Sequence, residues 1–160
     1  DAIVAVGGGS AIDSSKSIRE FALRVDHYAE VGLIAIPTTS GTGSEVTSFA
    51  VVSDPAEQRK YPLVSWELTP DEAILDAELV KSVPAAITAD TGMDVFTHAL
   101  EACVSTDRSD FSTALAEKSI ELVGVFLLRA YLDGMILMHV RRCILHPVWQ
   151  DWHSTQHLSD

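Results

Sequence analysis

The chain is organised around residues 88–102, which read T-A-D-T-G-M-D-V-F-T-H-A-L-E-A. Pro84, a residue that favours the first turn of a helix, precedes this segment, so a helix is predicted from Pro84 to about Val104. Asp94 and His98 are four residues apart, so in a helix they lie on the same face. A carboxylate oxygen and an imidazole nitrogen at this spacing supply half of a divalent-metal site.

An alternative interpretation of Asp94 and His98 is a solvated pair on a helix surface. Their neighbours argue for a buried pair, because the surrounding residues are apolar and a buried carboxylate needs a partner. These neighbours are Met93, Val95, Phe96, Ala99, Leu100 and Ala102. We therefore expect a buried pair that binds a metal ion.

Upstream, residues 3–6 and 33–36 are short apolar runs that predict buried parallel strands. The first run is followed by Gly7-Gly8-Gly9-Ser10, and a helix is expected from about Ala11. Backbone N–H groups at such a glycine turn can hold a phosphate, and a Cβ there would block its approach. The turn is not G-x-G-x-x-G, so a tight turn without a ligand stays the alternative. The helix is predicted from apolar residues at helical spacing, namely Ile12, Ile18, Phe21, Ala22 and Val25.

Residues 38–45 follow the second predicted strand and contain five hydroxyl side chains and two glycines. Hydroxyls and free amides at the carboxyl end of a parallel strand suit a bound nucleotide. The alternative is a turn rich in Ser and Thr that caps a helix. Glu45 is expected to be a structural cap rather than a catalytic acid.

The remaining pattern predicts a switch from α/β to all-α structure. Strands are expected at residues 49–52, 60–63 and 73–76, with a turn at 54–57, and a second helix over roughly 111–131. That helix should pack through Leu115, Ile120, Leu122, Val123, Phe126 and Leu127. We therefore predict an α/β domain over residues 1–82 and the start of a helical domain over residues 83–134.

Charge and composition argue against several classes of partner and location. A net charge of −12 argues against nucleic acid or an anionic membrane as a partner. No apolar run approaches the roughly 18 residues of a membrane span. Only Cys103 and Cys143 are present, which suits a reducing cytoplasm, and Cys103 is expected in a helix core.

Three motifs together resemble the iron-containing (group III) alcohol dehydrogenase family. They are G-G-G-S-x-x-D-x-x-K from Gly7, P-T-T-x-G-T-G-S-E-V-T from Pro37 and T-G-x-D-x-x-T-H-A-x-E from Thr91. In detail the chain looks most like the branch linked to ethanolamine and propanediol utilisation. The resemblance implies a partial α/β NAD(P)-binding domain with a parallel sheet, followed by the start of an all-α metal-binding domain, a truncated dehydroquinate synthase-like architecture. The implied reaction is hydride transfer between a primary alcohol or aldehyde and NAD or NADP.

The resemblance also implies site residues. Those expected to bind the cofactor are Gly8, Gly9, Ser10, Asp13, Thr38, Thr39, Thr42 and Lys60. Asp94 and His98 would bind Fe2+, with Zn2+ as the alternative metal, and no side chain is assigned as catalytic. Lys60 has a second interpretation as a solvated edge lysine. Lys16 matches the family's motif but has an alternative interpretation as an ordinary helix-surface lysine, so it is not assigned to the site. The expected partners are a small alcohol or aldehyde and, as in the intact family, further copies of the chain.

Residues 135–160 differ in character from the rest of the chain. They hold four of the six histidines and two of the three tryptophans, but no Glu or Ala. Codons displaced by one base after Gly134 can encode strings that resemble the family's next helices, so an out-of-frame translation is expected.

The chain also opens directly on a predicted strand, so we interpret it as a fragment. In the resembling family two further histidines downstream complete the metal site, so this chain is expected to be inactive. The alternatives are a catalytically dead gene-fragment product and an enzyme like the zinc-dependent glycerol dehydrogenases or dehydroquinate synthases.

Overall fold

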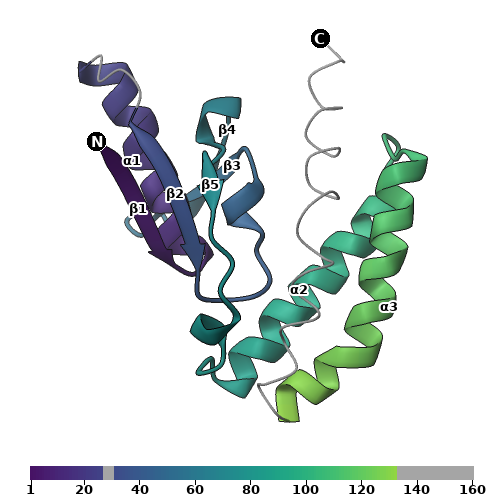
Figure 1. Cartoon of the computed structure of the whole chain (residues 1–160). Coiled ribbons are helices and arrows are strands. Elements are labelled where there is room, and N and C mark those ends of the chain that lie inside the picture. The colour runs from purple at the N-terminus through teal and green to yellow at the C-terminus, as the bar shows by residue number, and fades with distance from the viewer. Residues whose placement is uncertain (27–30, 133–160) are drawn as a thin grey trace. The chain divides into compact units, whose positions relative to one another are not determined.

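The computed structural model describes residues 1–26 and 31–132, which form two compact units (Figure 1). The first unit consists of Asp1–Thr38 and Ser44–Asp76. The second consists of Thr39–Gly43 and the described residues from Ala77 to Leu132. The expected out-of-frame segment, residues 135–160, lies outside the described residues.

The first unit is an α/β structure built on a parallel sheet. In chain order its elements are β1 (Ala2–Gly7), α1 (Gly9–Asp26), β2 (Gly32–Pro37), the 3-10 turn η1 (Ser44–Val46), β3 (Phe49–Asp54), β4 (Arg59–Val64), the 3-10 turn η2 (Trp66–Leu68) and β5 (Glu72–Ala73). Strands β1, β2 and β5 are parallel and adjacent in that order, with Gly7 opposite Pro37. The predicted parallel sheet is confirmed. The strand expected at residues 73–76 is shorter and begins one residue earlier.

Helix α1 packs on this sheet through a face that is mostly polar. Ile12 is fully buried with Ala5, Leu33 and Ala35. The other buried positions of the helix are Asp13, Lys16, Ser17 and Glu20. Ile18, Phe21 and Val25, whose spacing helped to predict the helix, are not part of this packed face: their side chains are 61%, 59% and 74% exposed. The predicted helix is confirmed, but its packed face is fixed by polar partners that lie far away in the sequence.

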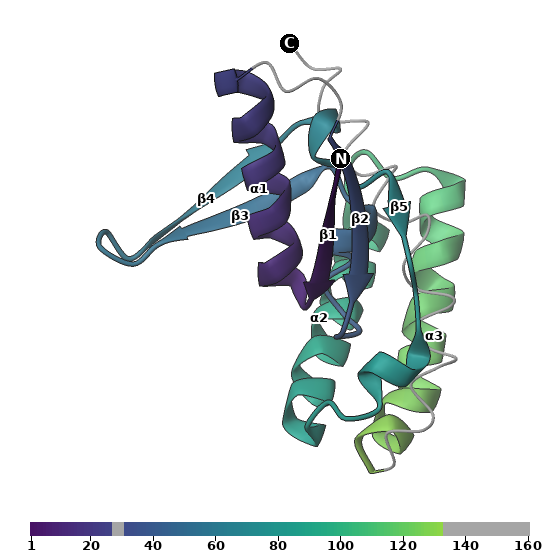
Figure 2. The same cartoon turned by 60° about the vertical axis from the view of Figure 1, so that its left-hand side comes forward.

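Strands β3 and β4 form a separate antiparallel hairpin that reaches away from the parallel sheet (Figure 2). Its tip is the predicted turn, where Asp54 Oδ1 accepts the amides of Ala56 at 2.8 Å and Glu57 at 3.3 Å. Gln58 has φ 51°, a left-handed conformation that closes the turn. The residues of β4 are mostly exposed.

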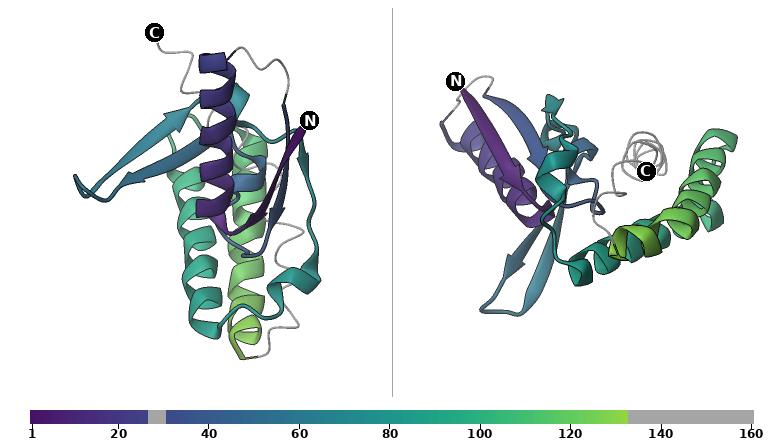
Figure 3. Two further views of the ribbon diagram at one scale, coloured as in Figure 1. Left: turned by 90° about the vertical axis from the view of Figure 1, so that its left-hand side faces the viewer. Right: turned by 60° about the horizontal axis from the view of Figure 1, so that its bottom comes forward.

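The second unit contains η3 (Ala77–Val80) and two long helices, α2 (Ala85–Val104) and α3 (Asp110–Leu132), which lie side by side (Figure 3). Pro84 is the N-cap of α2. Both helices confirm the sequence prediction. They pack through two clusters, one around Val95 and Val123 and one around Ala99, Ala102 and Ala116, with Cys103 against the second as expected.

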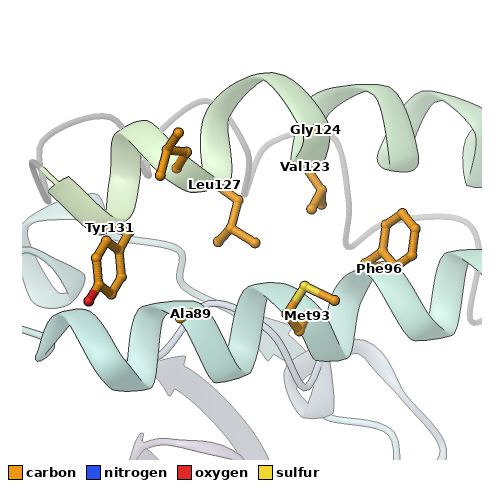
Figure 4. Close-up of a pocket in the computed structure, with 8 residues that line it drawn as sticks. Ala89, Met93, Phe96, Val123, Gly124, Leu127 and Tyr131 are labelled. Atoms are coloured by element: carbon orange, nitrogen blue, oxygen red, sulfur yellow. The ribbon is translucent and has the colours of Figure 1, made fainter.

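An open groove of about 460 Å³ runs between α2 and α3 (Figure 4). Its lining is almost entirely apolar and includes Met93, Phe96, Leu127 and Tyr131. Within the described part of the chain, none of the helices combines the length and apolarity that a membrane crossing requires.

Candidate functional site

The glycine turn joins β1 to α1 at the carboxyl end of the parallel sheet. Gly7 has φ 155°, and a Cβ there would lie 2.7 Å from the Ala11 Cβ, so a side chain is excluded at this position. The carbonyl of Gly8 accepts the Ala11 and Ile12 amides at 3.0 and 3.2 Å, which starts the helix. Gly8, Gly9 and Ser10 therefore lie at the N-terminus of an 18-residue helix. The first amides of a helix have no intrahelical partner and can bind an anion.

Thr38 is brought to the same edge of the sheet. Its amide donates to the Gly7 carbonyl at 2.9 Å, so the ends of β1 and β2 are joined directly. Thr39 and Thr42 belong to the loop Thr39–Gly43, which is part of the second unit. Lys60 is exposed on β4, opposite Ser53 in the hairpin, and not on the parallel sheet. The structure thus places Gly8, Gly9, Ser10 and Thr38 together in the first unit. Thr39 and Thr42 belong to the second unit and Lys60 to the hairpin, and the predicted cofactor contacts of all seven residues remain predictions.

Asp13 is buried and already has partners within the protein. Its Oδ1 accepts the Ser44 hydroxyl at 2.9 Å, and its Oδ2 accepts the Val51 amide at 3.0 Å. Both oxygens are thus directed at the segment that follows the hydroxyl-rich loop. This geometry gives Asp13 a structural task, and its predicted contact with a cofactor remains a prediction.

Lys16 is the residue that sequence reasoning missed. The structure excludes the alternative of a helix-surface lysine, because the side chain of Lys16 is completely buried. Its ammonium Nζ donates to the Thr47 carbonyl at 2.7 Å, the Thr47 Oγ1 at 3.1 Å and the Phe49 carbonyl at 2.8 Å. The available signal was its spacing of three residues from Asp13, which puts both charges on one helix face.

The charge on Lys16 is compensated only in part by its surroundings. Burial lowers the pKa of Lys16 to about 8, while Asp13 and the buried Glu45 raise it. Burial is the larger effect, so the folded protein holds this proton less tightly than the unfolded chain does.

The predicted metal ligands Asp94 and His98 lie on one face of α2, as their spacing requires. His98 Nε2 is 3.6 Å from Asp94 Oδ1, and the two side chains are 24% and 43% exposed. The expectation of a buried Asp94 is therefore wrong: Met93 and Leu100, counted among the apolar neighbours, are themselves about half exposed. An apolar sequence neighbourhood does not bury a residue when the other helix packs on the opposite face.

The donor atoms of Asp94 and His98 are of types that bind a divalent metal, but two ligands are fewer than a catalytic metal site needs. Carboxylate oxygen and imidazole nitrogen both suit Fe2+ and Zn2+. A catalytic site needs about three protein ligands. Within residues 1–26 and 31–132, no group of three or more His, Cys, Asp or Glu side chains is arranged to hold a metal ion. The described residues thus provide half of a site.

Close packing near Asp94 and His98 explains why glycine occupies positions 92 and 41. A Cβ on Gly92 would lie 2.2 Å from Leu127 Cδ1, so α2 and α3 approach closely there. A Cβ on Gly41 would lie 2.5 Å from the Thr91 Cβ and 2.7 Å from its carbonyl oxygen. The loop Thr39–Gly43 therefore packs directly on α2, one turn before Asp94.

Comparisons with known proteins agree with the motifs. The family model "Iron-containing alcohol dehydrogenase" matches residues 1–77, and "Fe-containing alcohol dehydrogenase family, C-terminal" matches residues 88–144. The second match continues past residue 134, where the resemblance was expected to end. The 1-propanol dehydrogenase PduQ of Citrobacter freundii is 56% identical over 131 residues, which are 79% of this chain and 34% of that protein. The NADPH-dependent butanol dehydrogenase of Clostridium saccharobutylicum is 38% identical over 161 residues, covering 90% of this chain and 42% of the relative.

Solved structures show the same relationship. The sulfoacetaldehyde reductase from Bifidobacterium kashiwanohense, solved in complex with NAD+, has a TM-score of 0.79 and 35% identity over 90% of this chain and 41% of that one. A 1,3-propanediol oxidoreductase has the same TM-score at 33% identity, over 94% and 42%. The chain spans about a third to two fifths of the length of these relatives. The family models, the relatives and the shared fold establish that this chain belongs to the iron-containing alcohol dehydrogenase family.

Proposed function

We propose that the chain is part of an NAD(P)-dependent, metal-dependent alcohol dehydrogenase that transfers hydride between a primary alcohol or aldehyde and the nicotinamide. The observation that carries this proposal is the Asp94–His98 pair, with 3.6 Å between Oδ1 and Nε2 on one face of α2. The pair lies in the segment that the C-terminal family model matches. Its donor types are those of a divalent-metal site.

The glycine turn is proposed to bind the pyrophosphate of the cofactor. Gly8, Gly9 and Ser10 present backbone amides at the positive end of the α1 dipole, which favours a negatively charged group. Thr38 lies at the same edge, since its amide is bound to the Gly7 carbonyl. Thr39, Thr42 and Lys60 keep their proposed roles in cofactor binding.

Asp94 and His98 are proposed to hold the metal. Asp94 would supply a negatively charged oxygen and His98 a neutral nitrogen, and the helix fixes their separation. The bound ion, Fe2+ or alternatively Zn2+, would supply Lewis-acid polarisation of the alcohol oxygen. The substrate is proposed to be a small primary alcohol, since similar proteins are named propanol and butanol dehydrogenases.

We further propose that the 160-residue chain alone lacks this activity. The described residues provide two metal donors, and a catalytic site needs about three. The test is NADH formation from ethanol or 1-propanol with added Fe2+. It compares the 160-residue chain with an extended version, in which segments of a longer relative precede Asp1 and replace residues 135–160.

The extended protein should be active, and His98→Ala in that protein should abolish turnover. His27→Ala is the matched control, because it removes the same imidazole at a position assigned to neither site. Turnover by the 160-residue chain equal to that of the extended protein would overturn the proposed inactivity. Full activity of the His98→Ala variant of the extended protein would overturn the assignment of His98 as a metal ligand.

A further inference from the structure

The two buried charges of α1 hold a segment that lies far away in the sequence. Asp13 and Lys16 stand on the same face of the helix, one and two turns after Gly9. Together they make five hydrogen bonds, all to residues 44–51. Asp13 binds a hydroxyl and an amide, whereas Lys16 binds two carbonyls and a hydroxyl. A carboxylate that accepts and an ammonium that donates thus hold complementary groups of one segment.

The hydrogen-bonding capacity of both side chains is well used. Lys16 Nζ has three acceptors for its three protons, all within 3.1 Å. Each oxygen of Asp13 accepts one bond. Hydrogen bonds to charged groups are stronger than neutral ones, and a buried group that loses its partner is costly. These contacts therefore fix residues 44–51 on α1.

The same helix carries the glycine turn. Thr38 is bound to the Gly7 carbonyl, and Ser44 is bound to Asp13. Thr38 and Ser44 flank the loop Thr39–Gly43. Thr38 is therefore held by the glycine turn, and Ser44 by the first part of α1. A shift of residues 44–51 along α1 would move one flank of that loop relative to the glycine amides.

We infer that Asp13 and Lys16 are positioning residues of the nucleotide site, which hold residues 44–51 on α1 so that Ser44, like Thr38, keeps its place relative to the glycine turn within the first unit. This inference rests on the proposed binding of NAD(P) at the glycine turn. Neither side chain touches the nucleotide in this role. The complete burial of Lys16 fits this role, because an ammonium kept away from water directs all three of its protons to acceptors of the protein.

The test combines hydrogen exchange with NADH and NADPH titration on the 160-residue chain. Lys16→Met removes the three donors and keeps most of the side-chain volume. The matched control is Lys118→Met, which makes the same change on the exposed face of α3, where Lys118 pairs with Glu121. Thr47→Val is a milder variant that removes one acceptor, and it replaces Lys16→Met if that protein does not fold.

Lys16→Met should speed amide exchange of residues 44–51 and raise the Kd for NADH roughly tenfold or more, in line with lost bonds to a charged group. Lys118→Met should change neither quantity. Wild-type affinity should also fall as the pH rises through about 8, because a bound pyrophosphate favours the charged lysine. That pH dependence should be absent in Lys16→Met. The charged groups that act on Lys16 are Asp13 on α1 and Glu45 on η1.

Two results would overturn the inference alone: faster exchange with an unchanged Kd, or a Kd that rises with no change in exchange. If the wild-type chain binds neither NADH nor NADPH at millimolar concentration, the proposed binding at the glycine turn fails and the inference falls with it.

Discussion

Substituting Gly41 tests how closely the loop Thr39–Gly43 must approach α2. In Gly41→Ala the new Cβ would lie 2.5 Å from the Thr91 Cβ, 2.7 Å from its carbonyl oxygen and 3.0 Å from its Cα. Two of these atoms belong to the backbone of a helix and cannot rotate away. The loop must therefore move outward, and overpacking of this kind costs about 1–3 kcal/mol of unfolding free energy. For a unit of this size the midpoint of thermal unfolding should fall by roughly 5–20 °C.

Two other glycines of the same unit provide matched controls. In Gly92→Ala the Cβ would meet Leu127 Cδ1 at 2.2 Å, but that atom is the end of a side chain that can rotate. The gain in helix propensity, about 1 kcal/mol, should largely offset the repacking. Gly124 has no atom within 4 Å of the new Cβ and lies in the middle of α3. Gly124→Ala should stabilise the helices by about 0.5–1 kcal/mol.

The assay is thermal and urea unfolding followed by circular dichroism at a helical wavelength. The expected order of stability is Gly124→Ala, then wild type and Gly92→Ala, then Gly41→Ala. A Gly41→Ala protein as stable as wild type would refute the close packing of loop on helix. A destabilised Gly124→Ala protein would contradict the open space that surrounds this position.

Three further predictions concern the candidate sites. Between pH 8 and 10.5 the unfolding free energy of the wild type should increase relative to that of Lys16→Met, by at most about 3 kcal/mol. The reason is that the unfolded chain binds the lysine proton more tightly than the folded protein does. The measurement is urea unfolding at a series of pH values, and a difference between the two proteins that does not change with pH would contradict this. Gly9→Val should abolish NADH binding by filling the space of the pyrophosphate, and an unchanged fluorescence titration would remove the turn from the site. Asp94→Ala should weaken the binding of Fe2+ or Zn2+ to the extended protein by at least tenfold, whereas Asp90→Ala, one turn earlier on α2, should leave the metal affinity measured by competition with a chelator unchanged.

Much of the fold could be predicted because its signals are local. The strands at residues 3–6 and 33–36 end at glycine or proline, and Pro84 marks the start of α2. The spacing of Asp94 and His98 fixed their common helix face without knowledge of any other residue. Periodicity and turn chemistry act within a few residues, so they can be read from one segment at a time.

The errors share a different cause. Lys16 is buried because Thr47 and Phe49, more than thirty residues away, offer it acceptors. Asp94 is half exposed because α3 packs on the opposite side of α2, around Val95. Which face of a helix is covered depends on partners from elsewhere in the chain, and no local pattern of apolar residues contains that information.

The complete burial of Lys16 also separates it chemically from the other lysines. Lys60, Lys81 and Lys118 are exposed to different degrees and should react readily with an acylating reagent. Lys16 can react only when the first unit opens, because its nitrogen is enclosed and fully engaged. The acylation rate of the peptide that contains Lys16, measured by mass spectrometry, would therefore report how often the first unit opens. Any ligand that slows the acylation of Lys16 without slowing that of the other three lysines must stabilise the first unit.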